Sequence, residues 1–223
     1  MTETAVPRTE DDNLIARRDA LLEATMPNVA FDGWSALSLA TGAAAIGIDP
    51  ADVVLLFPGG PAEAAASVSD WADRRMLERL ATMDIPAMKV RDRVAAGVRA
   101  RLEVLEPYRE AVRRALALTA NPSRAPAAMQ SVYRTVDAIW YAAGDTATDF
   151  NFYTKRVLLA GVYGATALYW LNDRSEGTAD SWAFLDRRLG EVMRLPKVTA
   201  RLRRTAEAVT APLHFLRRFR RAT

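Results

Sequence analysis

The sequence predicts an all-α fold. Apolar residues recur at helical rather than alternating spacing nearly everywhere along the chain. Ala, Leu and Arg are abundant, whereas Gly and Pro number only 11 each among 223 residues, a composition that favours helices. Because half of the residues are apolar, a chain of this length can bury a sizeable core as one globular protein.

Three short helices are predicted near the N-terminus. The first is amphipathic, covers Leu14–Thr25 and is ended by Pro27. The second covers Ser35–Ile46, with the serine as N-cap. The third starts at the Asp49-Pro50 pair, an N-cap followed by a proline at the first helical position, and stops at Phe57. A tight glycine turn between the second and third helices gives a helix-turn-helix outline.

Longer helices follow, separated by prolines and turn residues. Their predicted ranges are 61–82, 86–105, 107–119, 124–143, 150–171 and 178–195, with a last basic helix from 197. This order, a three-helix unit and then a bundle, resembles the outline of TetR-type regulators. We therefore divide the chain into a disordered N-terminus at 1–9, a helix-turn-helix-like unit at 10–60, a bundle at 61–196 and a basic amphipathic helix at 197–223.

The basic charge of the chain sits in its last helix. The net charge is +3, but residues 197–223 carry +7, so the rest carries −4. No Lys or Arg occurs between Arg18 and Arg74, and the expected recognition helix, PADVVLLF at 50–57, has no cation. Since affinity for DNA rests on cations at phosphates, we predict no nucleic-acid partner, and the unit is kept for packing. A ligand-responsive TetR-type transcription regulator is the alternative interpretation.

Two counts exclude most catalytic machinery. The chain has no Cys and a single histidine, His214. Thiolate chemistry, disulfides, histidine relays and multi-histidine metal sites are therefore excluded. A catalytic mechanism would have to use Asp, Glu, Lys, Arg and Tyr, and from these we name no catalytic residue and no metal ligand.

The densest group of chemically versatile residues is WYAAGDTATDFNFYTKR at 140–156, in the junction between two predicted helices. One interpretation is capping: Gly144 ends the first helix, and Asp145, Thr148 or Asp149 begins the next. A second interpretation makes the two aspartates an acid–base pair, although their spacing supplies no nucleophile, metal or oriented substrate.

The same segment resembles the signature of the coenzyme Q (ubiquinone) biosynthesis accessory family, which are TetR-fold lipid-binding proteins. The resemblance extends over nearly the whole folded chain. It is carried by Trp140, Ala143-Gly144-Asp145, Thr148-Asp149-Phe150-Asn151, Tyr153-Thr154-Lys155-Arg156, Phe57-Pro58-Gly59-Gly60, Leu158, Ala160, Val162-Tyr163, Thr166, Phe184-Leu185-Asp186-Arg187-Arg188 and Val192-Met193. Phe152 departs from it, because mitochondrial relatives tend to carry Trp there. The N-terminal extension of those relatives is also missing, so we expect a bacterial member.

The resemblance implies a non-catalytic protein whose only cofactor-like ligand is a bound lipid or isoprenoid quinone. It would present quinone precursors to a separate demethoxyubiquinone hydroxylase. The surface that faces this hydroxylase in the family carries over to Asp145, Asp149, Phe152, Tyr153 and Arg156.

Apolar stripes on two helices would line the lipid cavity. One stripe recurs at helical spacing within 124–143, and Val157–Leu171 is apolar on every side, although it is shorter than the about 20 residues that cross a bilayer. The predicted lipid-binding residues are Met129, Val132, Val136, Trp140, Leu159, Val162, Tyr163, Thr166 and Trp170. Ordinary core packing is the alternative for each of them.

The C-terminal segment has the pattern of a helix that lies on an anionic membrane, an apolar stripe flanked by arginines. Its predicted membrane-binding residues are Leu213, Phe215, Leu216, Arg217, Arg218, Phe219, Arg220 and Arg221. The acidic N-terminal sequence resembles neither a secretory signal nor a transit peptide, so we expect a bacterial cytoplasmic protein, peripheral on the inner membrane. Because TetR-like bundles pair through late helices, we also expect a homodimer.

Overall fold

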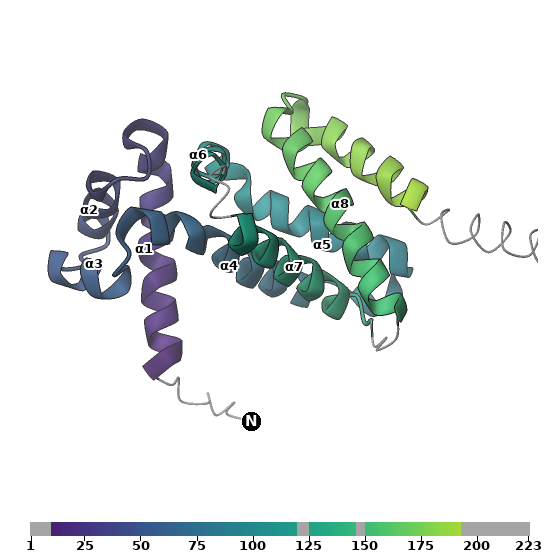
Figure 1. Cartoon of the computed structure of the whole chain (residues 1–223), viewed down its shortest axis with the longest axis horizontal. Coiled ribbons are helices and arrows are strands. Elements are labelled where there is room, and N and C mark those ends of the chain that lie inside the picture. The colour runs from purple at the N-terminus through teal and green to yellow at the C-terminus, as the bar shows by residue number, and fades with distance from the viewer. Residues whose placement is uncertain (1–9, 120–124, 146–149, 193–223) are drawn as a thin grey trace, which may run out of the picture. The chain divides into compact units, whose positions relative to one another are not determined.

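The computed structural model describes residues 10–119, 125–145 and 150–192. Within these ranges the chain forms helices and turns without a strand, which confirms the all-α prediction (Figure 1). The helices are α1 (Glu10–Asp32), α2 (Ala36–Ala45), α3 (Pro50–Leu56), α4 (Gly60–Ala81), α5 (Val90–Leu105), α6 (Arg109–Thr119), α7 (Ala125–Ala142) and α8 (Phe150–Asn172). Short 3-10 helices are η1 (Ile85–Ala87), η2 (Glu106–Tyr108) and η4 (Glu176–Thr178), and residues 179–192 are helical.

The chain divides into two compact units, one up to Asn172 and one from Asp173. In the second, Asp173 holds the start of the helix at 179–192 by accepting hydrogen bonds from the backbone N–H and hydroxyl groups of Ser175 and Ser181. Although partial burial acts in the opposite direction, these hydrogen bonds keep the pKa of Asp173 well below its usual range.

Local capping signals correctly predicted the short N-terminal helices. Ser35 caps α2 in a reciprocal capping box with Ser38, with both hydrogen bonds at 3.1 Å. Asp49 caps α3 by accepting from the Ala51 N–H at 2.8 Å. Both bounds lie where the sequence placed them because each cap needs only residues within one turn.

The predicted end of the first helix at Pro27 is wrong, because α1 continues to Asp32. A proline lacks the N–H of one helical hydrogen bond and disfavours a helix interior. Here Met26 and Val29, on either side of it, are fully buried, and α1 packs along α2. Burial of this apolar face outweighs the local cost of the proline.

Two later helices also begin after their predicted starts. The helix expected from Pro86 opens as η1, and α5 starts at Val90 after an extended Met88. The helix expected from Pro107 opens as η2 before α6. In both cases the proline begins a tighter 3-10 turn, a common form at helix N-termini. The predicted basic helix from 197 lies outside the described residues.

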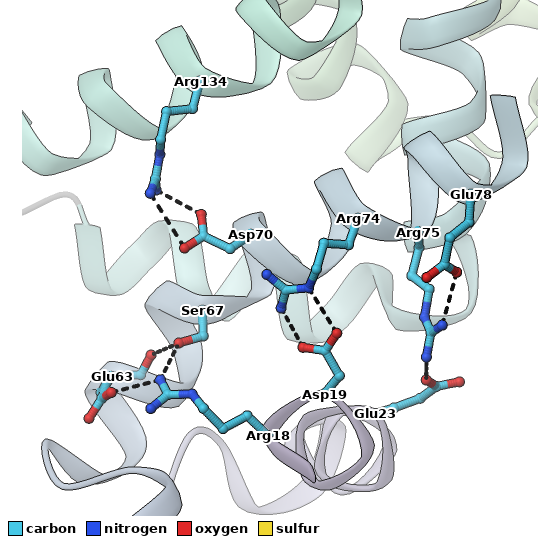
Figure 2. Close-up of polar contacts among 10 residues, drawn as sticks. All are labelled: Arg18, Asp19, Glu23, Glu63, Ser67, Asp70, Arg74, Arg75, Glu78 and Arg134. Carbon is cyan, nitrogen blue, oxygen red and sulfur yellow. Dashed lines mark hydrogen bonds and ion pairs between the residues drawn. The ribbon is translucent and has the colours of Figure 1, made fainter. Parts of the chain in front are cut away.

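Charged side chains join α1 to α4 (Figure 2). Arg18 contacts Glu63 at 2.7 Å, Arg74 pairs with Asp19, and Arg75 reaches Glu23 at 3.1 Å. A groove of about 720 Å³ lies beside these pairs, and both acids and arginines line it. An isoprenoid chain needs mostly apolar walls, so this groove is unsuited to one.

Gly42 lets α2 approach α1 closely. A Cβ added at this position would lie 2.9 Å from the backbone N and Cα of Thr25 and 2.5 Å from its hydroxyl oxygen. Real Cβ atoms do not tolerate such distances, so a larger residue would force the two helices apart.

We therefore expect Gly42→Ala to lower the free energy of unfolding by about 1–3 kcal/mol, measured by chemical denaturation. The matched control is Gly161→Ala in α8, whose added Cβ would meet nothing within 4 Å. It should leave stability unchanged or raise it by about 0.5–1 kcal/mol, because alanine favours helices. Equal destabilisation by the two changes would contradict the close approach.

Candidate partner-binding and lipid-binding site

The corner between α7 and α8 begins with a glycine that ends α7, as the sequence predicted. Gly144 has a φ of +81°. Its N–H donates to the Tyr141 carbonyl at 2.9 Å, and the Asp145 N–H donates to the Trp140 carbonyl at 3.0 Å. This pair of bonds is the Schellman ending of a helix, in which a left-handed glycine is favoured. Arg93 of α5 adds a bond to the Ala143 carbonyl at 3.1 Å.

A network of ion pairs connects α7 and Asp145 to α8 at this corner. Asp145, only 8% exposed at its side chain, accepts from Lys155 at 2.7 Å and from Arg156 at 3.4 Å. Arg156, 4% exposed, also contacts Asp137 of α7 at 2.6 Å. The Trp140 ring lies under the Lys155 ammonium, with 5.4 Å between the nitrogen and the ring centroid. Because the Asp145 and Arg156 charges are removed from water and paired, they fix how α7 meets α8.

The structure separates the predicted partner-binding residues into two kinds. The side chains of Asp145 and Arg156 are 8% and 4% exposed and pair with each other and with Lys155 and Asp137. Tyr153, in contrast, is 63% exposed. Asp149 and the side chain of Phe152 lie outside the described part of the chain. Two further residues were not predicted from the sequence: Asp137, which completes the network, and Tyr141, which is 80% exposed. The short spacing from Asp137 to Trp140 and Tyr141 was the signal that could have pointed to them.

Most of the predicted lipid-binding residues lie in the packed interior. Val136, Leu159, Val162, Tyr163, Thr166 and Trp170 are buried. Thr166 donates to the Val162 carbonyl at 2.7 Å, and the Trp170 indole donates to Glu106 at 2.6 Å. Val132 and Trp140 are half-buried, and Met129 is 74% exposed.

A buried arginine connects these helices. Arg101 of α5 contacts Asp73 of α4 at 2.7 Å and also pairs with the Tyr163 hydroxyl of α8. Thr135 of α7 donates to the same Asp73 carboxylate at 2.9 Å. Burial lowers the pKa of Arg101, but Tyr163 and Asp73 raise it by more, so the guanidinium stays charged. Burial raises the pKa of Tyr163, against the opposite effect of Arg101.

The predicted membrane-binding residues from Leu213 to Arg221 lie outside the described ranges. No single described helix is long and apolar enough to cross a membrane. One bent pair, α2 with α3, reaches that length and composition together, with a bend of 116°.

Comparison with known proteins assigns the family. The sequence pattern of the COQ9 family matches residues 125–196, which include α7, the corner and α8. The ubiquinone biosynthesis protein COQ9-B, mitochondrial, of Xenopus laevis is 30% identical over 199 residues, covering 85% of this chain and 67% of that protein. The chain belongs to the COQ9 family.

Other COQ9 proteins show the same relationship. The COQ9 of Drosophila melanogaster is 35% identical over 194 residues, covering 83% of this chain and 59% of its own length. That of Rattus norvegicus is 31% identical over 199 residues, with 86% and 64% covered. The chain thus spans about three fifths of these relatives, both named as mitochondrial. Family membership confirms the resemblance found in the sequence.

The fold has a known counterpart. A TetR transcriptional regulator from Nitrosomonas europaea matches with a TM-score of 0.67 and 23% identity, over 80% of this chain and 98% of that chain. At this identity the likeness is one of fold, and it confirms the TetR-like architecture that the order of helices predicted for this COQ9 protein.

The corner network yields a test. We expect Asp145→Asn to lower the free energy of unfolding by about 1–3 kcal/mol, because it leaves the buried Arg156 without one of its charged partners. Chemical denaturation of the full chain measures this loss. Asp32→Asn, at an exposed carboxylate, is the control and should change stability by less than about 0.5 kcal/mol. A loss no larger than that of the control would show that the pairs do not fix the corner.

Proposed function

We propose that this COQ9 protein binds isoprenoid quinone precursors and presents them to a demethoxyubiquinone hydroxylase, with no catalysis of its own. The named relatives are ubiquinone biosynthesis proteins, and the family pattern falls on the corner and its two helices. The observation that carries the proposal is the contrast at that corner: buried ion pairs hold it rigid, while Tyr153 stands 63% exposed beside them.

This contrast is suited to protein recognition. Tyrosine is enriched at protein interfaces, and a side chain on a fixed support loses little freedom when it binds. Asp145 and Arg156 then act by positioning the surface, and Tyr153, with the exposed Tyr141, offers contact area. Asp149 and Phe152 complete the proposed partner surface.

The lipid would enter between α7 and α8. Val136, Leu159 and Val162 present apolar surface to the interior, as an isoprenoid chain requires. Met129, which is exposed on α7, would be an outer contact. Entry requires the helices to separate, so the bound lipid replaces part of the packing of the free protein.

The C-terminal segment would supply the membrane contact of the proposed function. The arginines and apolar residues from Leu213 to Arg221 would hold the protein on the anionic inner membrane of a bacterium, facing the cytoplasm.

A homodimer would cover the exposed apolar residues of α8, where Val157 is 70% and Leu168 is 62% exposed. With no cation between Arg18 and Arg74, we propose no nucleic-acid partner.

The partner surface predicts the effect of one substitution. We expect Tyr153→Ser to weaken binding to the demethoxyubiquinone hydroxylase by about tenfold or more, as loss of an interface tyrosine commonly does. The matched control is Phe31→Ser, because Phe31 is 85% exposed on α1, away from the corner in the sequence. Binding is measured by titrating labelled hydroxylase, and circular dichroism verifies that both variants fold.

The same variants test the delivery step. Wild-type protein and Phe31→Ser should stimulate hydroxylation of demethoxyubiquinone by the hydroxylase on vesicles, whereas Tyr153→Ser should stimulate it far less. Unchanged binding and stimulation by Tyr153→Ser would refute the proposed surface.

A further inference from the structure

One arginine of α5 connects the end of α7 to the segment that precedes α5. Each of the three guanidinium nitrogens of Arg93 donates to a different backbone carbonyl. Nε donates to Met88 at 2.9 Å, Nη2 to Pro86 at 2.8 Å and Nη1 to Ala143 at 3.1 Å. Because a lysine ammonium lacks this planar fork of donors, the arrangement requires an arginine.

The two parts that Arg93 joins are both suited to this contact. The segment at 85–88 is anchored in the bundle by the buried Ile85 of η1. Ala143 directly follows α7, where the last carbonyls lack helical N–H partners and the helix dipole favours a cation. The next residue, Gly144, leaves room for the arginine, because a Cβ added there would lie 3.2 Å from Arg93 Nη1.

The end of α7 carries part of the proposed partner surface. Tyr141, which is 80% exposed, lies in the last turn of α7. Beside it, the Trp140 indole donates to the Lys155 carbonyl of α8 at 3.3 Å, in the helix that presents Tyr153. Arg93 therefore holds the backbone from which Tyr141 projects, and Trp140 connects this backbone to α8.

We propose that Arg93 is a positioning residue of the partner surface, an inference that rests on the proposed binding to the hydroxylase. Arg93 acts without touching the hydroxylase. By joining η1 to the end of α7, it keeps the corner in the conformation that the hydroxylase binds. A surface already held in its bound conformation loses less freedom on association. Removal of the arginine should therefore reduce the affinity of a protein that is still folded.

Arg93→Met in the full chain removes all three hydrogen bonds and keeps an unbranched apolar side chain. We expect the Gly144 and Asp145 amides, which close the end of α7, to exchange with deuterium about tenfold faster, measured by NMR. Binding to labelled hydroxylase should weaken by about fivefold or more. The matched control is Arg99→Met, at an exposed arginine of the same helix, and it should change neither quantity.

Two further variants distinguish positioning from stability and from the proposed function. Gly42→Ala, which we expect to destabilise the contact of α1 with α2, should leave the affinity of the folded protein for the hydroxylase unchanged. Equal loss of affinity in Gly42→Ala and Arg93→Met would overturn the positioning role, as would wild-type amide exchange in Arg93→Met. Unchanged affinity of Arg93→Met beside a weakened Tyr153→Ser would overturn it and leave the proposed function standing. Unchanged affinity of both would overturn the proposed partner surface as well.

Discussion

The arrangement of the helical bundle depends on one buried guanidinium. Arg101 is 4% exposed and joins α5 to Asp73 and Ser69 of α4 and to Tyr163 of α8. Thr135 of α7 shares the Asp73 carboxylate. A buried charge is costly unless it is paired and hydrogen-bonded. Sliding α4 past α5 would separate Arg101 from Asp73, and sliding α7 or α8 would remove a hydroxyl hydrogen bond from this charged pair. The cluster therefore fixes the register of these helices more than it adds to their stability.

The corner between α7 and α8 follows from that register. With α7 and α8 held in place, Asp137 and Asp145 meet Lys155 and Arg156, and their ion pairs support the exposed Tyr153. The Arg101 cluster also limits how far α8 can move in the proposed lipid site, because Arg101 donates to the Tyr163 hydroxyl of α8. Under the proposed function, a quinone would part α7 and α8 at apolar residues such as Val136 and Val162, while the contacts of Arg101 stay formed.

How far the sequence predicted the structure depended on the distance between interacting residues. The caps at Ser35 and Asp49 and the end of α7 at Gly144 act within a few residues, and all three were predicted. The error at Pro27 arose because packing between α1 and α2 overrides the local preference. Arg101 could not be recognised, since its partners lie 28 to 62 residues away. Surface arginines and buried ones look alike until the fold brings acids to them.

The lipid that copurifies with this COQ9 protein is the best test of whether it carries isoprenoid quinones. Lipid extracted from the purified full chain should be analysed by mass spectrometry beside a total extract of the membranes from which the protein was obtained. We expect isoprenoid quinones or their precursors to be enriched in the protein extract relative to phospholipid. Phospholipids and quinones in the same proportion as in the membranes would refute quinone binding.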